Sequence, residues 1–296
     1  MNTELKSHFV IVGIGKQAEK ALLAMKGTIH DSSKRISIQT NTQAAATDPN
    51  LEYHLLSFDD VSRTSNEPFK ALTSQLHADY VLLIASYASS TEINLSKHLA
   101  NYLIDHKIKG LCLIEEPYKN ITNRAAYETA LLAIQKTNMP LLILPVINES
   151  RQDDRITKPV QIAKSIASFI YHSNFFSVDT YDLASQLAKG TQSYHAMMEY
   201  DFVDDTEQLS LHIRHAIQQI KKQYKEQGMD VEQSPKILLI LLGSETLTQR
   251  EIAFIGKYIN EKDDAEQDTI FGVSFNNELI ETRVLHVFAV KRGCSN

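Results

Sequence analysis

Two strand-to-helix turns carry the side chains that could hold an anion. The first runs from Gly13 through Gly15 to Lys16 and Lys20. Backbone N–H groups at the start of a helix favour negative charge, and the two lysines could reach a phosphate from there. The same residues also suit an ordinary turn whose first helical residues face solvent. The sequence favours this ordinary turn and leaves the anion site open as the alternative.

The second turn follows the apolar run Tyr80–Ala85 and contains no glycine. Its hydroxyls, Ser89, Ser90 and Thr91, could donate hydrogen bonds to an anion, but a helix N-cap made by Ser90 or Thr91 explains them more simply. Glu92 then adds a negative charge. At about 4 Å and an effective dielectric constant near 20, two like unit charges repel by roughly 4 kcal/mol. We therefore expect this turn to disfavour a phosphate.

Glycine is scarce along the whole chain. Ten glycines among 296 residues is less than half of the usual share of about 7%. Phosphate-binding loops use glycine heavily, because their backbone N–H groups must approach the anion closely and often at positive φ. The composition leaves little glycine for such loops.

No other catalytic or metal-binding pattern stands out. The histidines at 195, 212, 215 and 286 follow no recognised metal-ligand spacing, so we expect no metal site. No Ser-His-Asp or Cys-His arrangement is signalled either.

The composition indicates a cytoplasmic protein with a sizeable core. The chain has 296 residues, 43% of them hydrophobic, and a formal net charge of -6. That length suits one large or two modest domains. The mild acidity argues against nucleic-acid binding, which needs clustered Lys and Arg. The absence of a signal sequence, of an apolar run of about 18–20 residues and of a disulfide framework predicts a cytoplasmic location without a direct membrane anchor.

Apolar strands alternate with helical patterns in the first half of the chain, which predicts a doubly wound, mostly parallel sheet. We expect strands at 9–15, 36–40, 52–57, 80–85, 111–114 and 141–145, and helices at 17–25, 66–77, 91–106 and 124–136.

The second half predicts an α+β domain behind a long helix at 160–171. Further helices are expected at about 181–198, 206–227 and 248–260, and strands at 237–242, 269–274 and 282–290. Thr248 and Glu251 have the spacing of a capping box. The buried stripe of the amphipathic helix 206–227 is expected to be Leu209, Ile213, Ala216, Ile217 and Ile220.

Motifs in the same order along nearly the whole chain resemble the FtsZ/tubulin superfamily. The segment 237–248, ILLILLGSETLT, resembles the strand-turn-helix LVNITGGxDLTL of FtsZ. Segment 281–290 resembles DELRVTVIATG, segment 9–15 resembles IKVIGVGG, and segment 192–198 resembles GxAMMG in the helix expected at 181–198. The resemblance implies a tubulin/FtsZ-like α/β fold. Its domains would be a Rossmann-like domain at 1–155, a central helix with a synergy-type loop and a following helix at 156–199, and an α+β domain at 200–293.

The same resemblance implies a degenerate nucleotide site. FtsZ proteins bind GTP with loops of the form GxGGGGGNA and GGGTGTG, which 13–21 and 86–92 resemble with most glycines replaced. Arg124 matches an arginine that faces the phosphates in the family motif TKPFxxEGxxR. GTP or GDP would be the ligand of any remaining site, although no cofactor is firmly expected. Its residues would be Gly13, Gly15, Lys16, Lys20, Ser89, Ser90, Thr91 and Arg124.

A pair of carboxylates, Asp179 and Asp182, matches the family's synergy loop. In the family, two carboxylates of this loop enter the GTP site of the next subunit and position water. These two aspartates would be the catalytic residues if the protein were a GTPase. Simple N-capping of the following helix explains the same Asp-x-x-Asp equally well.

The leading hypothesis is a divergent FtsZ-like protein of the cytoskeletal, cell-division type with weak or lost GTP binding. It would act by end-to-end self-assembly or by association with an FtsZ-type filament. One alternative is an active GTPase that forms nucleotide-dependent filaments through remodelled loops. Another is a monomeric adaptor that binds a different small ligand.

Overall fold

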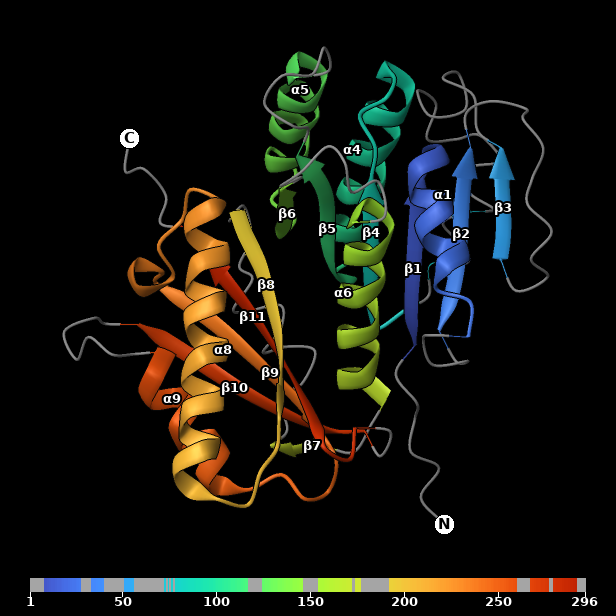
Figure 1. Ribbon diagram of the computed structural model, residues 1–296. Coiled ribbons are helices and arrows are strands. Elements are labelled where there is room, and N and C mark those ends of the chain that lie inside the picture. The colour runs from blue at the N-terminus through green and yellow to red at the C-terminus, as the bar shows by residue number, and fades with distance from the viewer. Residues whose placement is uncertain are drawn as a thin grey trace. The chain divides into compact units, whose positions relative to one another are not determined.

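The computed structural model describes residues 8–27, 33–39, 51–55, 72, 74, 76, 78–116, 124–145, 154–171, 174–176, 192–259, 267–276 and 279–291 (Figure 1). The chain divides into two compact units. The N-terminal unit comprises Met1–Tyr171 with Leu187–Thr191, and the C-terminal unit comprises His172–Gln186 with Gln192–Asn296.

The N-terminal unit is built on parallel strands in the order β3-β2-β1-β4-β5-β6. Every residue of β1 and β4 is buried, as expected for central strands of a parallel sheet that is covered on both faces. The strands are β1 (Phe9–Ile14), β2 (Lys34–Gln39), β3 (Leu51–Leu55), β4 (Tyr80–Ala85), β5 (Lys109–Glu116) and β6 (Leu141–Pro145).

The described helices of this unit form two pairs. They are α1 (Gly15–Ala24), α4 (Ser90–Asp105), α5 (Arg124–Gln135) and α6 (Asp154–Tyr171), and α1 contacts α6 whereas α4 contacts α5. From β1 the chain moves through α1 to β2, and from β4 it moves through α4 to β5, in the opposite direction along the sheet. Right-handed crossovers then place α1 and α4 on opposite faces. The carboxyl ends of β1 and β4 form the topological switch point, where doubly wound proteins bind ligands.

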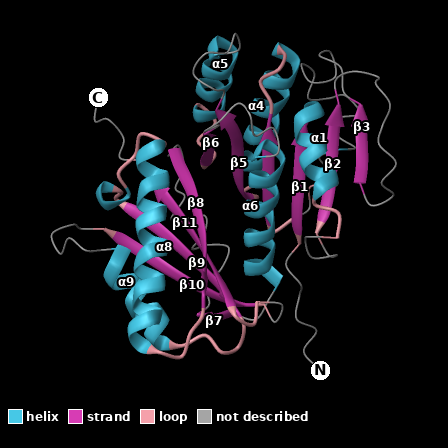
Figure 2. Ribbon diagram, in the orientation of Figure 1, coloured by secondary structure: helices cyan, strands magenta, loops and turns pink. Residues whose placement is uncertain are grey.

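The C-terminal unit is a mostly antiparallel sheet in the order β8-β11-β9-β10-β7, in which only the pair β9 and β10 is parallel (Figure 2). Its helices α8 (Thr206–Glu226) and α9 (Gln249–Ile259) contact each other, and a short 3-10 turn spans Val231–Gln233. The strands are β7 (Asn174–Phe176), β8 (Gln192–Asp201), β9 (Lys236–Gly243), β10 (Asp268–Phe275) and β11 (Thr282–Val290).

Helix α8 is fixed to β8 through side chains that reach the strand backbone. The amide of Gln223 donates to Met197 O at 3.0 Å and accepts from Met197 N at 3.4 Å. The Tyr224 hydroxyl shares its one proton between Val287 O of β11, at 2.7 Å, and Tyr194 O of β8, at 3.2 Å. The apolar stripe of α8 is buried as predicted, so the helix is held by both apolar and polar contacts.

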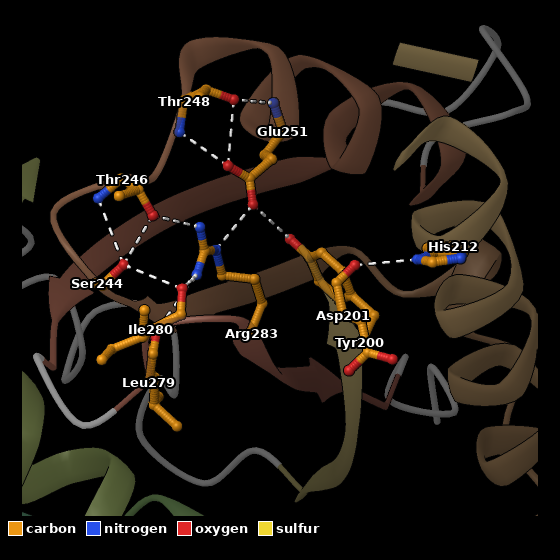
Figure 3. Close-up of polar contacts among 10 residues, drawn as sticks. All are labelled: Tyr200, Asp201, His212, Ser244, Thr246, Thr248, Glu251, Leu279, Ile280 and Arg283. Atoms are coloured by element: carbon orange, nitrogen blue, oxygen red, sulfur yellow. Dashed lines mark hydrogen bonds and ion pairs between the residues drawn. The ribbon is translucent and has the colours of Figure 1, made fainter. Parts of the chain in front are cut away.

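A buried ion pair connects α9 to β11 (Figure 3). Arg283 Nε and Glu251 Oε1 lie 3.0 Å apart, and both side chains are 0% exposed. Glu251 Oε2 accepts hydrogen bonds from the backbone N (2.8 Å) and hydroxyl (3.1 Å) of Thr248, which confirms the predicted capping box. The Tyr200 hydroxyl donates to Glu251 Oε1 at 3.4 Å. This carboxylate therefore has several partners that compensate for its burial.

The guanidinium of Arg283 also organises two turns. Its Nη1 donates to the carbonyl oxygens of Leu279 (3.3 Å) and Ile280 (3.2 Å), and its Nη2 donates to Thr246 Oγ1 at 2.9 Å (Figure 3). The guanidinium carbon lies 4.4 Å from the centre of the Phe202 ring. One arginine thus joins the β9–α9 turn to the segment before β11.

One predicted element is wrong. The helix expected at 181–198 is replaced over Gln192–Asp201 by strand β8, which pairs with β11 from Ser193 opposite Val290 to Asp201 opposite Thr282. The run Ala196-Met197-Met198 has good helix propensity, but pairing with a strand far along the chain outweighs a local preference. The likeness of 192–198 to GxAMMG therefore falls on a strand. Residues 181–191, and most of the helix expected at 66–77, lie outside the described residues.

We expect Glu251→Ala to lower the free energy of unfolding of the C-terminal unit by about 3–5 kcal/mol, because it leaves the Arg283 charge buried without its carboxylate. Urea denaturation followed by circular dichroism measures the loss. Glu226→Ala is the control, since Glu226 is exposed and pairs with Lys222 across one helical turn at 4.0 Å; its loss should not exceed about 0.5 kcal/mol. Similar losses in the two variants would contradict the role of the buried pair.

Candidate functional site

The turn from β1 into α1 lies at the switch point and is crowded by a side chain from α4. Gly15, the first residue of α1, has φ of +80°. A Cβ added there would lie 2.5 Å from Glu92 Oε1 and 3.2 Å from Ser86 Oγ. Glycine is therefore favoured at position 15 by its backbone conformation and by the carboxylate beside it.

Glu92 is buried at this point, with 7% of its surface exposed. Its Oε2 accepts a hydrogen bond from Ser86 Oγ at 2.8 Å. The Ser86 oxygen in turn accepts from Ala88 N at 3.3 Å. The carboxylate is thus hydrogen-bonded to the turn after β4 and lies close to Gly15 in the turn after β1.

The N-cap of α4 is Ser89, and the prediction of Ser90 or Thr91 is wrong. The Ser89 hydroxyl accepts a hydrogen bond from Glu92 N at 3.2 Å, and its backbone is extended (φ -143°, ψ 160°). Ser90 is exposed and Thr91 is half-buried. The spacing Ser89-x-x-Glu92 is the sequence signal that identifies the cap.

The other predicted site residues near the turn between β1 and α1 are Gly13, Lys16 and Lys20. A Cβ at Gly13 would lie 2.7 Å from Leu22 Cδ1 and 3.0 Å from the Cβ of Ala18, so this glycine allows α1 to approach β1 closely. Lys16 and Lys20 are exposed. The structure therefore gives Gly13 a packing role and leaves the two lysines facing solvent.

Arg124 is engaged by carboxylates of the protein. It pairs with Glu116 at 3.0 Å and with Glu128 at 3.1 Å, and its guanidinium carbon lies 5.5 Å from the centre of the Tyr127 ring. The hydrogen bond to Glu128 and, to a smaller extent, the hydrogen bond to Glu116 raise the pKa of Arg124 above its ordinary value. The two glutamates thus engage Nε and Nη1 of Arg124 and offset its positive charge.

A small pocket of about 190 Å³ opens beside these turns, as bounded by the described residues. Ligand sites in proteins usually enclose about 300–1,000 Å³. The polar side chains at this pocket are few, and the Tyr87 ring, which also lines it, lies edge-on to Tyr127 at 5.6 Å. The lining residues are Ile14, Gln17, Ala18, Ala21, Ile84, Ala85, Ser86, Tyr87, Ala88, Leu113, Glu115 and Pro159.

The remaining predicted site residues, Asp179 and Asp182, lie outside the described residues, so their role stays a prediction. Sequence reasoning missed a contact between two histidines of the C-terminal unit. His195 Nε2 and His286 Nδ1 lie 3.1 Å apart, and the rings are stacked. The pairing of β8 with β11 brings these residues together across 91 positions of sequence. Within the described residues no group of three or more His, Cys, Asp or Glu is arranged to hold a metal ion.

The amino-acid sequence matches no protein-family model and no curated protein. The fold is nevertheless similar to solved structures over almost its whole length. The FtsZ dimer of M. jannaschii, described as empty, superposes with a TM-score of 0.73 at 13% identity, covering 98% of this chain and 89% of that chain. The chain has the FtsZ/tubulin fold.

Two further structures with this fold are assemblies. The GTPγS-bound protofilament of CetZ2 from Haloferax volcanii matches with a TM-score of 0.71 at 13% identity, covering 97% of this chain and 94% of that chain. GDP-form protofilaments of TubZ from Bacillus thuringiensis serovar israelensis match with a TM-score of 0.61 at 12% identity, covering 96% and 84%. Within the described part of this FtsZ-like chain, no helix is both long and apolar enough to span a bilayer.

We expect Gly15→Ala to destabilise the protein more than Gly27→Ala does. Both glycines have positive φ, +80° and +68°, but a Cβ at Gly27 meets nothing within 4 Å. Both variants incur the backbone cost of about 1–2 kcal/mol, whereas only Gly15→Ala also crowds Glu92, at a further cost of about 1–3 kcal/mol. Urea denaturation of the two variants measures the difference. Equal losses would contradict the close contact between Gly15 and Glu92.

Proposed function

We propose that this protein is a divergent FtsZ-like cytoskeletal protein that binds guanine nucleotide weakly or not at all. It acts through contacts between proteins, either by end-to-end self-assembly or by joining an FtsZ-type filament. The observation that carries the proposal is the buried Glu92 carboxylate, which lies at the switch point between Gly15 and Ser86.

The size of the electrostatic effect supports this reading of the site. A phosphate placed about 4 Å from the Glu92 carboxylate meets a repulsion of roughly 4 kcal/mol at an effective dielectric constant near 20. Each 1.4 kcal/mol changes affinity about tenfold, so this repulsion alone turns micromolar binding into roughly millimolar binding. The small pocket and the engagement of Arg124 by two glutamates act in the same direction.

We expect isothermal titration calorimetry of the purified protein with GTP, and separately with GDP, to show no binding tighter than about 100 µM. Acid release followed by chromatography should find no guanine nucleotide carried through purification. An FtsZ of known activity, treated in parallel, controls for nucleotide loss during handling. Micromolar affinity for either nucleotide would contradict the proposal. GTP turnover that disappears in Asp179→Ala and in Asp182→Ala would instead establish the active GTPase.

Assembly is the second half of the proposal, and similar structures include a dimer and protofilaments. We expect this protein to sediment as oligomers, or to pellet together with FtsZ-type filaments, to the same extent with and without added GTP. Analytical ultracentrifugation and co-pelleting measure this. Assembly that requires GTP would contradict the proposal. If the protein stays monomeric at high concentration and does not pellet with FtsZ filaments, the monomeric adaptor becomes the favoured hypothesis.

A further inference from the structure

The two turns at the switch point meet at a single carboxylate. Glu92 Oε2 accepts from the Ser86 hydroxyl at 2.8 Å, and Oε1 faces Gly15 closely enough that a Cβ there would lie 2.5 Å away. Ser86 belongs to the turn after β4, and Gly15 begins α1 after β1. The carboxylate therefore accepts a hydrogen bond within the β4–α4 segment and packs closely against the start of α1, which follows the neighbouring strand.

Helix α1 lacks the negative charge that commonly stabilises a helix N-terminus. Its N-cap residue, Ile14, makes no side-chain cap, and no acidic residue lies in its first turn. The N-terminal end of a helix carries a partial positive charge, and a nearby anion stabilises it. Here the nearby anion is the side chain of Glu92, which belongs to a different helix.

Burial of this carboxylate requires compensation. Glu92 is 7% exposed, and among the described residues no Lys or Arg pairs with it. An ionised carboxylate that leaves water without such a partner is costly unless hydrogen bonds and local dipoles replace its hydration. The groups at hand are the first turn of α4, to which Glu92 belongs, the Ser86 hydroxyl and the first turn of α1. The Ser86 hydroxyl and the first turn of α1 would serve a bound anion in the same way.

We propose that Glu92 is a built-in substitute for a bound anion. Its carboxylate occupies the position between the first turn of α1 and the Ser86 turn that a phosphate group would otherwise fill, and it holds both turns in place without a ligand. This inference rests on the proposed function, because it supplies the structural reason why the site needs no nucleotide. Removal of the carboxylate then opens a site for a phosphate-class anion.

The test compares thermal unfolding of the full chain in sodium chloride and in sodium phosphate of equal ionic strength. The wild-type protein should show no phosphate-specific shift of Tm. Glu92→Ala should unfold at a lower Tm in chloride and recover in phosphate, with a saturating rise. That rise should reach roughly 5 °C when the phosphate concentration is 100 times the dissociation constant.

Two further variants distinguish phosphate binding at the Glu92 position from a general effect of removing one negative charge. Glu207→Ala removes an exposed acidic residue from the first turn of α8, and its Tm should show no phosphate-specific recovery. Glu92→Gln removes the charge but keeps the side chain in place, so it should be less stable than wild type and should not be restored by phosphate. Recovery of Glu92→Gln equal to that of Glu92→Ala would overturn the proposal.

The remaining outcomes are also decisive. If Glu92→Ala folds but its Tm ignores phosphate, the proposal is overturned. If that variant fails to fold in chloride, refolding in phosphate supports the proposal, and failure in both salts overturns it. Micromolar GTP binding by the wild-type protein would remove the proposed function whatever the variant does. Absent GTP binding together with a phosphate-insensitive Glu92→Ala would remove this inference alone.

Discussion

The stability of the N-terminal unit depends on neutralising the partial positive charges at the N-termini of its helices. These N-termini lie at the edge of the parallel sheet formed by the carboxyl ends of the strands. Crossover helices of a doubly wound fold begin at this edge, so their partial positive charges collect at the switch point between β1 and β4. A bound anion is one way to neutralise such an edge. In this chain the buried carboxylate of Glu92 lies there instead, linked to Ser86 and pressed against Gly15.

Glu251 of the C-terminal unit is buried, like Glu92, and is likewise the third residue of its helix. Ser89-x-x-Glu92 and Thr248-x-x-Glu251 have the same spacing at the starts of α4 and α9. Glu251 completes the capping box by accepting from Thr248 N, and it also pairs with Arg283. Glu92 accepts instead from Ser86, outside its own helix. The same local motif therefore has two outcomes. In the C-terminal unit its glutamate is part of a buried ion-pair network, whereas in the N-terminal unit its glutamate lies at the switch point.

Features set by local sequence were predicted well, and features set by distant contacts were not. The strands β4, β6 and β11 have their predicted limits. Strands β4 and β6 are short apolar runs, and β11 is rich in apolar and β-branched residues. Strand β8 was mistaken for a helix, since its conformation depends on pairing with β11. The contact between His195 and His286 and the Arg283–Glu251 pair escaped prediction for the same reason. The charge of Glu92 was recognised, but its close approach to Gly15 depends on how the turn after β1 meets the start of α4.

The few glycines that remain near the switch point serve the protein's own packing. Gly13 makes room for Leu22 and Ala18, and Gly15 makes room for Glu92. In a phosphate loop, glycines would instead leave space and free N–H groups for a ligand. The turn after β4 holds Ser, Ala and Glu, and Ser86 and Glu92 complete contacts within the chain. Under the proposed function, such internal contacts would do the work that a bound nucleotide does elsewhere.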